Sequence, residues 1–144
     1  MSDKNTREII SGLLNSQITG VLATNKDDQP YGSLVAFSFS DDFKKIFFAT
    51  LSNTTKYKNL LENPQVSIVI DSRRNDPGDF SGSIAISALG RSRELTGDLK
   101  VKMIQIHSNR LPGLSNFLKM DFIAIFEIEV NKYIVSEGVN TTNV

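Results

Sequence analysis

Short apolar stretches with a two-residue period, each ended by a turn sequence, follow one another along most of this chain and limit its fold more than any other feature. An amphipathic helix is expected before them, at about Thr6 to Ser16, with Asn5 and Glu8 at the spacing of a capping box. From Thr19 the period changes to that of strands. The expected strands cover residues 19–25, 30–39, 45–51, 65–71, 83–95 and 121–135. Such a series favours a mainly β protein of the α+β kind, built as an antiparallel barrel with peripheral helices.

The connections between these strands read as turns or short helices rather than as catalytic segments. The doublets Asp27-Asp28 and Asp41-Asp42 lie in turn sequences, and adjacent strand residues point to opposite faces, so neither doublet presents two acids to one substrate. Short helices are expected at residues 55–63 and 98–108. Gly90, inside the long strand 83–95, indicates a bulge or a close approach of another backbone.

The last expected strand has an unusual distribution of apolar residues. Its first half, Phe122–Phe126, is apolar on both faces, and only later do Glu127 and Glu129 make one face polar. Burial on both sides predicts either a second layer of the same chain or a second subunit. The residues that follow, 136–144, are expected to be a mobile tail.

Length and charge set broad limits on the class of protein. A chain of 144 residues fits one domain, residues 1–144, and without cysteine it has no disulfide or thiolate metal site. With 16 basic and 16 acidic residues the net charge is zero, which gives no long-range attraction to nucleic acid or anionic lipid. The polar start resembles no secretion signal, and no apolar run reaches the ~20 residues of a membrane span. A cytoplasmic protein without nucleic-acid or membrane partners is therefore expected.

The sequence "SNTTK", Ser52 to Lys56, separates the third strand from a short helix and offers the clearest candidate site. In the simpler interpretation, Thr54 or Thr55 caps the helix. In the functional one, the free N–H groups at the helix start, the hydroxyls of Ser52, Thr54 and Thr55, and the charge of Lys56 bind a phosphate. The first interpretation holds whether or not the second does.

The segment "PYGSLVAFSFSDDFK", followed by "KIFFATLSNTTKYKNLLENPQVSIVI", resembles the pyridoxamine 5'-phosphate oxidase-like, FMN-binding split-barrel proteins. The shared features are a strand after a proline, an aromatic-rich strand ending in Thr, a hydroxyl-rich loop with Lys, a short helix, Asn-Pro and another apolar strand. The resemblance is closest over residues 18–71, and the order of elements extends it to 6–135. It implies a single-domain, six-stranded antiparallel split β-barrel that binds FMN at the interface of a homodimer.

The resemblance also assigns cofactor contacts by position. The strand segment Ser33, Leu34, Val35 and Ala36 would run along the isoalloxazine ring, and Ala49-Thr50 would contact the flavin. The phosphate pair, often Arg-Lys in the oxidase, falls on Thr55-Lys56. Because Thr55 lacks a charge, either the affinity is lower or Arg73 or Arg74 compensates, and Arg74 is included among the candidate contacts.

One further departure argues against the oxidase reaction itself. The sequence "RLP" at Arg110–Pro112 lacks the spacer of the oxidase's substrate signature and precedes the last strand. The expected function is therefore a flavin-dependent oxidoreductase acting on a small substrate, without a catalytic acid or base that can be named. The alternatives are a non-enzymatic flavin or haem carrier or sensor, a deazaflavin in place of FMN, and an interaction domain with an empty barrel.

Isolated charged residues outside this motif carry weaker indications. His107, the one histidine, is expected to be a packed or half-exposed side chain, because a lone imidazole builds no zinc site, although it can serve as an axial haem ligand. Arg91 and Arg93 share a strand face, where they are either solvent-exposed or able to steer an anionic ligand.

Overall fold

The computed structural model describes residues 3–138 and 140–144. The elements, in chain order, are α1 (Asp3–Ser16), β1 (Thr19–Lys26), β2 (Gln29–Phe39), β3 (Lys45–Leu51), α2 (Thr55–Glu62), β4 (Gln65–Asp71), α3 (Asp79–Gly82), β5 (Ile84–Leu95), α4 (Gly97–Arg110), the 3₁₀ turns η1 (Pro112–Leu114) and η2 (Phe117–Lys119), β6 (Ile123–Glu137) and β7 (Asn140–Asn143). Among the described residues, no helix has the length and apolar character needed to cross a bilayer.

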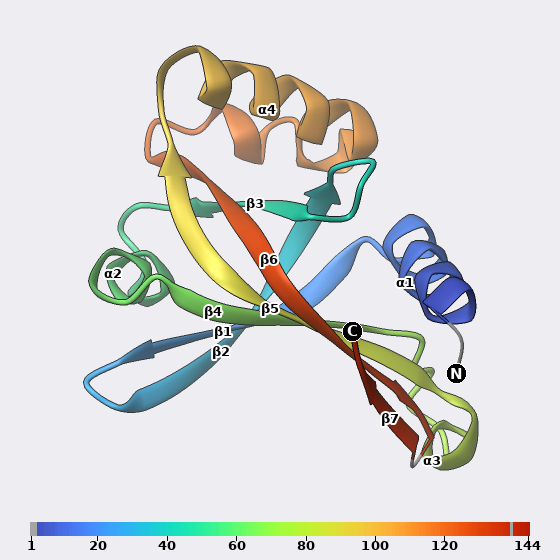
Figure 1. Ribbon diagram of the computed structural model, residues 1–144. Helices are drawn as coiled ribbons and strands as arrows, with labels where there is room; N and C mark the ends of the chain where they lie inside the picture. Colours follow the sequence, from blue (N-terminus) through green and yellow to red (C-terminus); the bar gives the residue numbers. More distant parts are fainter. Residues whose placement is uncertain (1–2, 139) are drawn as a thin grey trace.

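The strands form one antiparallel sheet that closes on itself. Their order is β3-β2-β1-β4-β5-β6-β7, and β3 also pairs with β6, so that β1 to β6 make a closed six-stranded barrel (Figure 1). The expected split-barrel fold is thereby confirmed. Where the sequence led us to expect a mobile tail, β6 continues to Glu137 and β7 (Asn140–Asn143) pairs with it from Ile134 to Glu137.

The interior of the barrel is filled by side chains that alternate along its strands. The largest fully buried ones include three phenylalanines, of which Phe48 and Phe126 stack with ring centroids 5.5 Å apart while Phe37 lies on β2. Burying an aromatic or branched aliphatic side chain contributes about 1.5–3 kcal/mol, so this core is the main source of stability. The alternation in the sequence was therefore a sound guide to the strands.

A second apolar cluster lies outside the barrel, beneath α4. Ile123 and Ile125 of β6 pack there with Leu95, Met103 of α4 and Leu118 of η2. The opposite face of the same strand contributes to the barrel interior. The two-sided apolar segment thus packs against a second layer of the same chain, one of the two alternatives that its pattern allowed.

Local details confirm some sequence predictions and correct others. Asp27 and Asp28 form the tight β1–β2 turn with positive φ angles of 53° and 60°. The β5–β6 register shifts between Leu89 and Gly90, and a Cβ at Gly90 would overlap the backbone of β6, which confirms the predicted bulge. Asn5 lies inside α1 and not at its start, so the predicted capping box is wrong.

Arg110, at the end of α4, connects α1 to the barrel through hydrogen bonds. Its guanidinium donates to the carbonyl oxygens of Leu14 and Gln17 at 2.9 Å and of Phe37 at 3.1 Å. Leu14 lies in the last turn of α1 and Gln17 directly follows it, where helix carbonyls lack partners within the helix. This contact brings α4 next to β2 and so sets one wall of the pocket described below.

Candidate functional site

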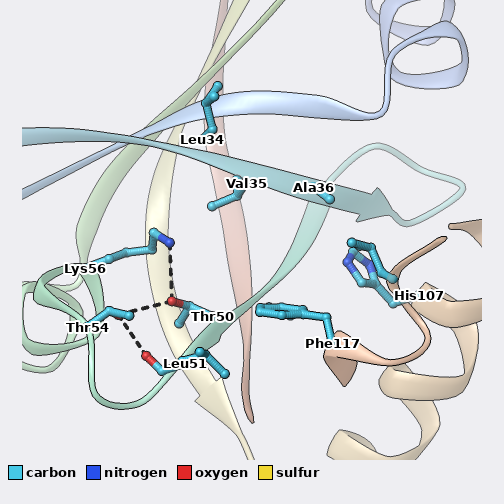
Figure 2. A pocket seen from close by; sticks show the side chains of 11 residues that line it. Leu34, Val35, Ala36, Thr50, Leu51, Thr54, Lys56, His107 and Phe117 are labelled. Carbon is cyan, nitrogen blue, oxygen red and sulfur yellow. Dashed lines mark hydrogen bonds between the residues drawn. The ribbon is translucent and has the colours of Figure 1, made fainter. Parts of the chain in front are cut away.

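A pocket of about 390 Å³ opens beside β2, β3, the start of α2 and the end of α4. Apolar side chains make most of its wall, and its polar groups gather at two places, around Lys56 and at His107. Figure 2 shows Lys56 on one side and His107 on the other, with Thr50, Val35 and Phe117 between them. The lining residues are Leu34, Val35, Ala36, Ala49, Thr50, Leu51, Thr54, Lys56, His107, Leu114 and Phe117.

The start of α2 is capped by Thr54. Its backbone is extended, with φ −105° and ψ 160°, and its hydroxyl accepts a hydrogen bond from the backbone N–H of Tyr57 at 3.3 Å. The same hydroxyl donates to the carbonyl of Leu51 at 2.8 Å. The capping interpretation is therefore confirmed and falls on Thr54, while Thr55 is the exposed first residue of the helix.

A chain of hydrogen bonds connects Lys56 to this cap (Figure 2). Lys56 Nζ donates to the buried hydroxyl of Thr50 at 3.3 Å, and the Thr50 and Thr54 hydroxyls lie 3.3 Å apart. Since the Thr54 proton points to Leu51, Thr50 is the donor in that pair. Both threonine protons are thus engaged within the protein, and Lys56 is the group with spare N–H donors.

Lys56 is half-buried, and no carboxylate of the described residues lies within ion-pair distance of it. Burial lowers the pKa of its ammonium group, because desolvation disfavours the charged form. A cation in this position gains most from a bound anion, and the adjacent N-terminus of α2 favours one as well. The pocket is therefore suited to a ligand that carries a negative group.

His107 lies in the part of the pocket formed by α4. The residue is 2% exposed, and its Nδ1 lies 2.6 Å from the hydroxyl of Ser38 on β2. Burial, and then the nearby charge of Arg110, lower its pKa from 6.5 to about 4, so the imidazole is neutral near pH 7. Its Nε2 is buried and has no hydrogen-bond partner in the described part of the chain.

The structure brings together most of the residues assigned from the sequence. Leu34, Val35, Ala36, Ala49, Thr50, Thr54 and Lys56 all line the pocket. Ser33 precedes them on β2, and its buried hydroxyl has no hydrogen-bond partner among the described residues. Ser52 and Thr55 flank the pocket without lining it.

The arginines proposed to compensate for Thr55 lie elsewhere within this chain. Arg74 lines a separate pocket with Asp76 and Asp79, beyond the end of β4 that is remote from α2 (Figure 1). Arg73 forms an ion pair with Asp71 at 3.2 Å. Of the described residues that line the pocket, Lys56 is the one lysine or arginine that a single chain supplies.

Arg91 and Arg93 of β5, the other arginines considered from the sequence, do not line this pocket either. Arg93 pairs with Glu127, a carboxylate that is 4% exposed and also contacts Lys45 at 3.1 Å. The two cations hold the pKa of Glu127 below its ordinary value against the opposing effect of burial. Among the residues described, no cluster of three metal-binding side chains occurs.

The sequence did not predict the side of the pocket that α4 and the two 3₁₀ turns after it form. His107 was expected to be packed or half-exposed and is buried, but its place in the pocket was not foreseen, and neither were Leu114 and Phe117. These residues are separated from β2 by about half the chain, and helical spacing shows which face is buried without showing against which strand. No local signal in the sequence could have found them.

Comparison with known proteins gives one family and many similar folds. The family profile of pyridoxamine 5'-phosphate oxidase matches residues 6–128. No curated protein sequence gives a significant match.

Three solved structures illustrate the likeness of fold. A heme binding protein from Mycobacterium smegmatis aligns with a TM-score of 0.82 and 16% identity over 95% of this chain, which spans 56% of that protein's length. A FAD-binding protein from Mesorhizobium loti aligns with a TM-score of 0.71 and 20% identity over 94% of both chains. HutZ, the heme storage protein of Vibrio cholerae, aligns with a TM-score of 0.74 and 17% identity over 90% of this chain and 89% of its own. At these identities the likeness establishes the fold.

Proposed function

The chain belongs to the pyridoxamine 5'-phosphate oxidase family, and on that premise we propose that it binds FMN in the pocket beside Lys56 and uses it to oxidise or reduce a small substrate. The observation that carries the proposal is Lys56 itself, a half-buried cation at a helix start with no carboxylate partner among the described residues. A phosphate provides the missing negative charge.

The chain's own residues would hold the cofactor by its two chemically different parts. Lys56 and the start of α2 bind the phosphate, while the apolar wall that includes Val35 and Ala49 accepts the flat ring and excludes water from it. The flavin, when bound, supplies the electron transfer. Because the protons of Thr50 and Thr54 are already engaged, Lys56 provides most of the phosphate affinity.

The oxidase reaction of the family's namesake is not part of this proposal. Arg110, the arginine of "RLP", has its guanidinium bound to three carbonyl groups and lies over the ring of Phe39 at 4.7 Å. Its role is to hold α1 and α4 together. Without that arginine free for a substrate, another small substrate is the better expectation.

We further propose that two copies of the chain close the site. Leu34, on the pocket rim, is 73% exposed, and Ile18, which lines an adjoining apolar cavity of about 500 Å³, is 58% exposed. Covering such side chains removes apolar surface from water. Light scattering should give twice the chain mass of 16.0 kDa, and Leu34→Glu should give the mass of a single chain. A single-chain mass for the unmodified protein would refute the dimer.

The binding proposal is tested by titrating flavins into matched lysine variants. Lys56→Met should weaken FMN binding by about 1.5–3 kcal/mol, the contribution of a hydrogen bond to a charged group. Lys58→Met, on the exposed side of the same helix, serves as the control and should bind like the unmodified protein. Riboflavin, which lacks the phosphate, should bind both variants equally.

Two outcomes would contradict the proposal: an unmodified protein that stays colourless and ignores added FMN, or equal FMN affinity of the two lysine variants. Turnover with NAD(P)H separates an oxidoreductase from a flavin carrier, because a carrier should show none.

A haem carrier or sensor is the second candidate, favoured by the unpaired Nε2 of His107 in the pocket. An axial ligand must offer its lone pair to the iron, and a hydrogen bond from Nδ1 to Ser38 is compatible with that. The lack of exposed surface at Nε2 makes the fit to iron poorer than the fit of FMN to Lys56. The visible spectrum of the purified protein decides between them, since a Soret band marks haem.

A further inference from the structure

We propose that His107 Nε2 forms a hydrogen bond with an uncharged polar atom of the bound flavin's ring system, and thereby acts as a second recognition point of the pocket. The inference depends on the proposed flavin site and adds a residue that the family resemblance did not assign. It gives the pocket two recognition points: Lys56 for the charged end of the ligand and His107 for the ring.

The first step concerns the two nitrogens of the imidazole. Nδ1 lies 2.6 Å from the Ser38 hydroxyl, a strong hydrogen bond in either direction. If Ser38 donates, Nε2 carries the ring proton and lacks an acceptor; if Nδ1 donates, Nε2 has a lone pair and lacks a donor. In both tautomers one polar atom has no partner in the part of the chain that the structure describes, and the residue is 2% exposed.

The second step concerns the cost of that unpaired atom. A buried polar group without a partner is unfavourable, and native proteins pair the great majority of such groups. Those that remain unpaired require an explanation, and a ligand is one when the residue lines a pocket. His107 lines the same pocket as Lys56, together with Ala36 and Phe117.

The third step concerns charge. Burial and the Arg110 guanidinium keep the imidazole uncharged near pH 7. The uncharged imidazole therefore offers a phosphate no formal charge, unlike Lys56. The carbonyl and nitrogen groups of an isoalloxazine ring are uncharged and can meet either tautomer.

Access to Nε2 requires a side chain to move, because the surrounding protein covers the atom. Phe117 is the candidate, since it lines the pocket on the short turn η2 and is only partly buried. Figure 2 shows its ring between Thr50 and His107.

The test compares two amide substitutions that each keep one nitrogen position of the histidine. In His107→Asn the amide keeps the contact with Ser38 and removes the group at Nε2, whereas His107→Gln places its amide near Nε2. Both are titrated with FMN and with riboflavin, and thermal unfolding without ligand reports whether the fold is intact. Absorption spectra of the bound flavin report on hydrogen bonds to its ring.

His107→Asn should weaken FMN and riboflavin alike, by roughly 3- to 10-fold, the effect of one neutral hydrogen bond, and should shift the flavin absorption bands. His107→Gln should restore much of the affinity. Unchanged affinity and spectra in His107→Asn, with the unmodified protein binding flavin normally, would overturn the role of His107 and leave the proposed function intact. Failure of the unmodified protein to bind either flavin would overturn both.

Discussion

Acidification should destabilise the fold through His107. The pKa of His107 is about 4 in the folded protein, and we take the ordinary value of 6.5 for the unfolded chain. Between these two pH values the unfolded chain binds the proton and the folded protein does not. The free energy of unfolding therefore falls as the pH drops through this window. At 1.36 kcal/mol per pKa unit, the difference corresponds to a loss of about 3 kcal/mol once the pH is below about 4.

Urea unfolding of the flavin-free protein at several values between about pH 7 and pH 4 measures this loss. His107→Asn is the reference, because the amide keeps the Ser38 contact and does not titrate. Glu127 also loses stabilising contacts in acid, but it is present in both proteins and its effect cancels in the difference. The stability gap between the two proteins should change by about 3 kcal/mol across the window. Parallel pH profiles would refute the assignment of a buried, neutral His107.

Two further predictions concern the scaffold. Gly90→Ala should prevent normal folding, because its Cβ would overlap the β6 backbone. Gly12→Ala, on the exposed side of α1, has open space around the new Cβ and should stabilise the protein by about 0.5–1 kcal/mol. Equal melting temperatures of the two variants would contradict this prediction. Thr54→Ala should cost about 1 kcal/mol in urea unfolding through the lost helix cap, while Thr55→Ala should cost much less, and the reverse order would place the cap wrongly.

The sequence was sufficient for the barrel because alternation in each strand reports which face is buried. It was also sufficient for half of the pocket, because β2, β3 and the start of α2 are close in sequence and their motif is local. The other half depends on a contact across 69 residues, between His107 and Ser38, for which one sequence offers no signal.

Two elements show other limits of reading a single sequence. The segment Asn140–Asn143 is polar throughout, so no apolar period announces β7; it forms because β6 extends past the closed barrel and offers backbone groups to pair with. Asn5 has the residue type of a cap, yet α1 is already helical from Asp3, so residue type alone did not locate the start of the helix.

The length of β6 leaves an edge of the sheet that β7 covers with a short polar strand. On one edge, β6 pairs with β5 along most of its course; on the other, β3 covers only the part from Ile123 to Glu129. The distal half would present free backbone donors and acceptors, an open template for another molecule's strand. The four polar residues of β7, together with the paired backbones of Tyr133 and Val144, occupy that template from Tyr133 to Glu137. A variant truncated before Asn140 would therefore keep its pocket and core but would aggregate through the exposed edge of β6.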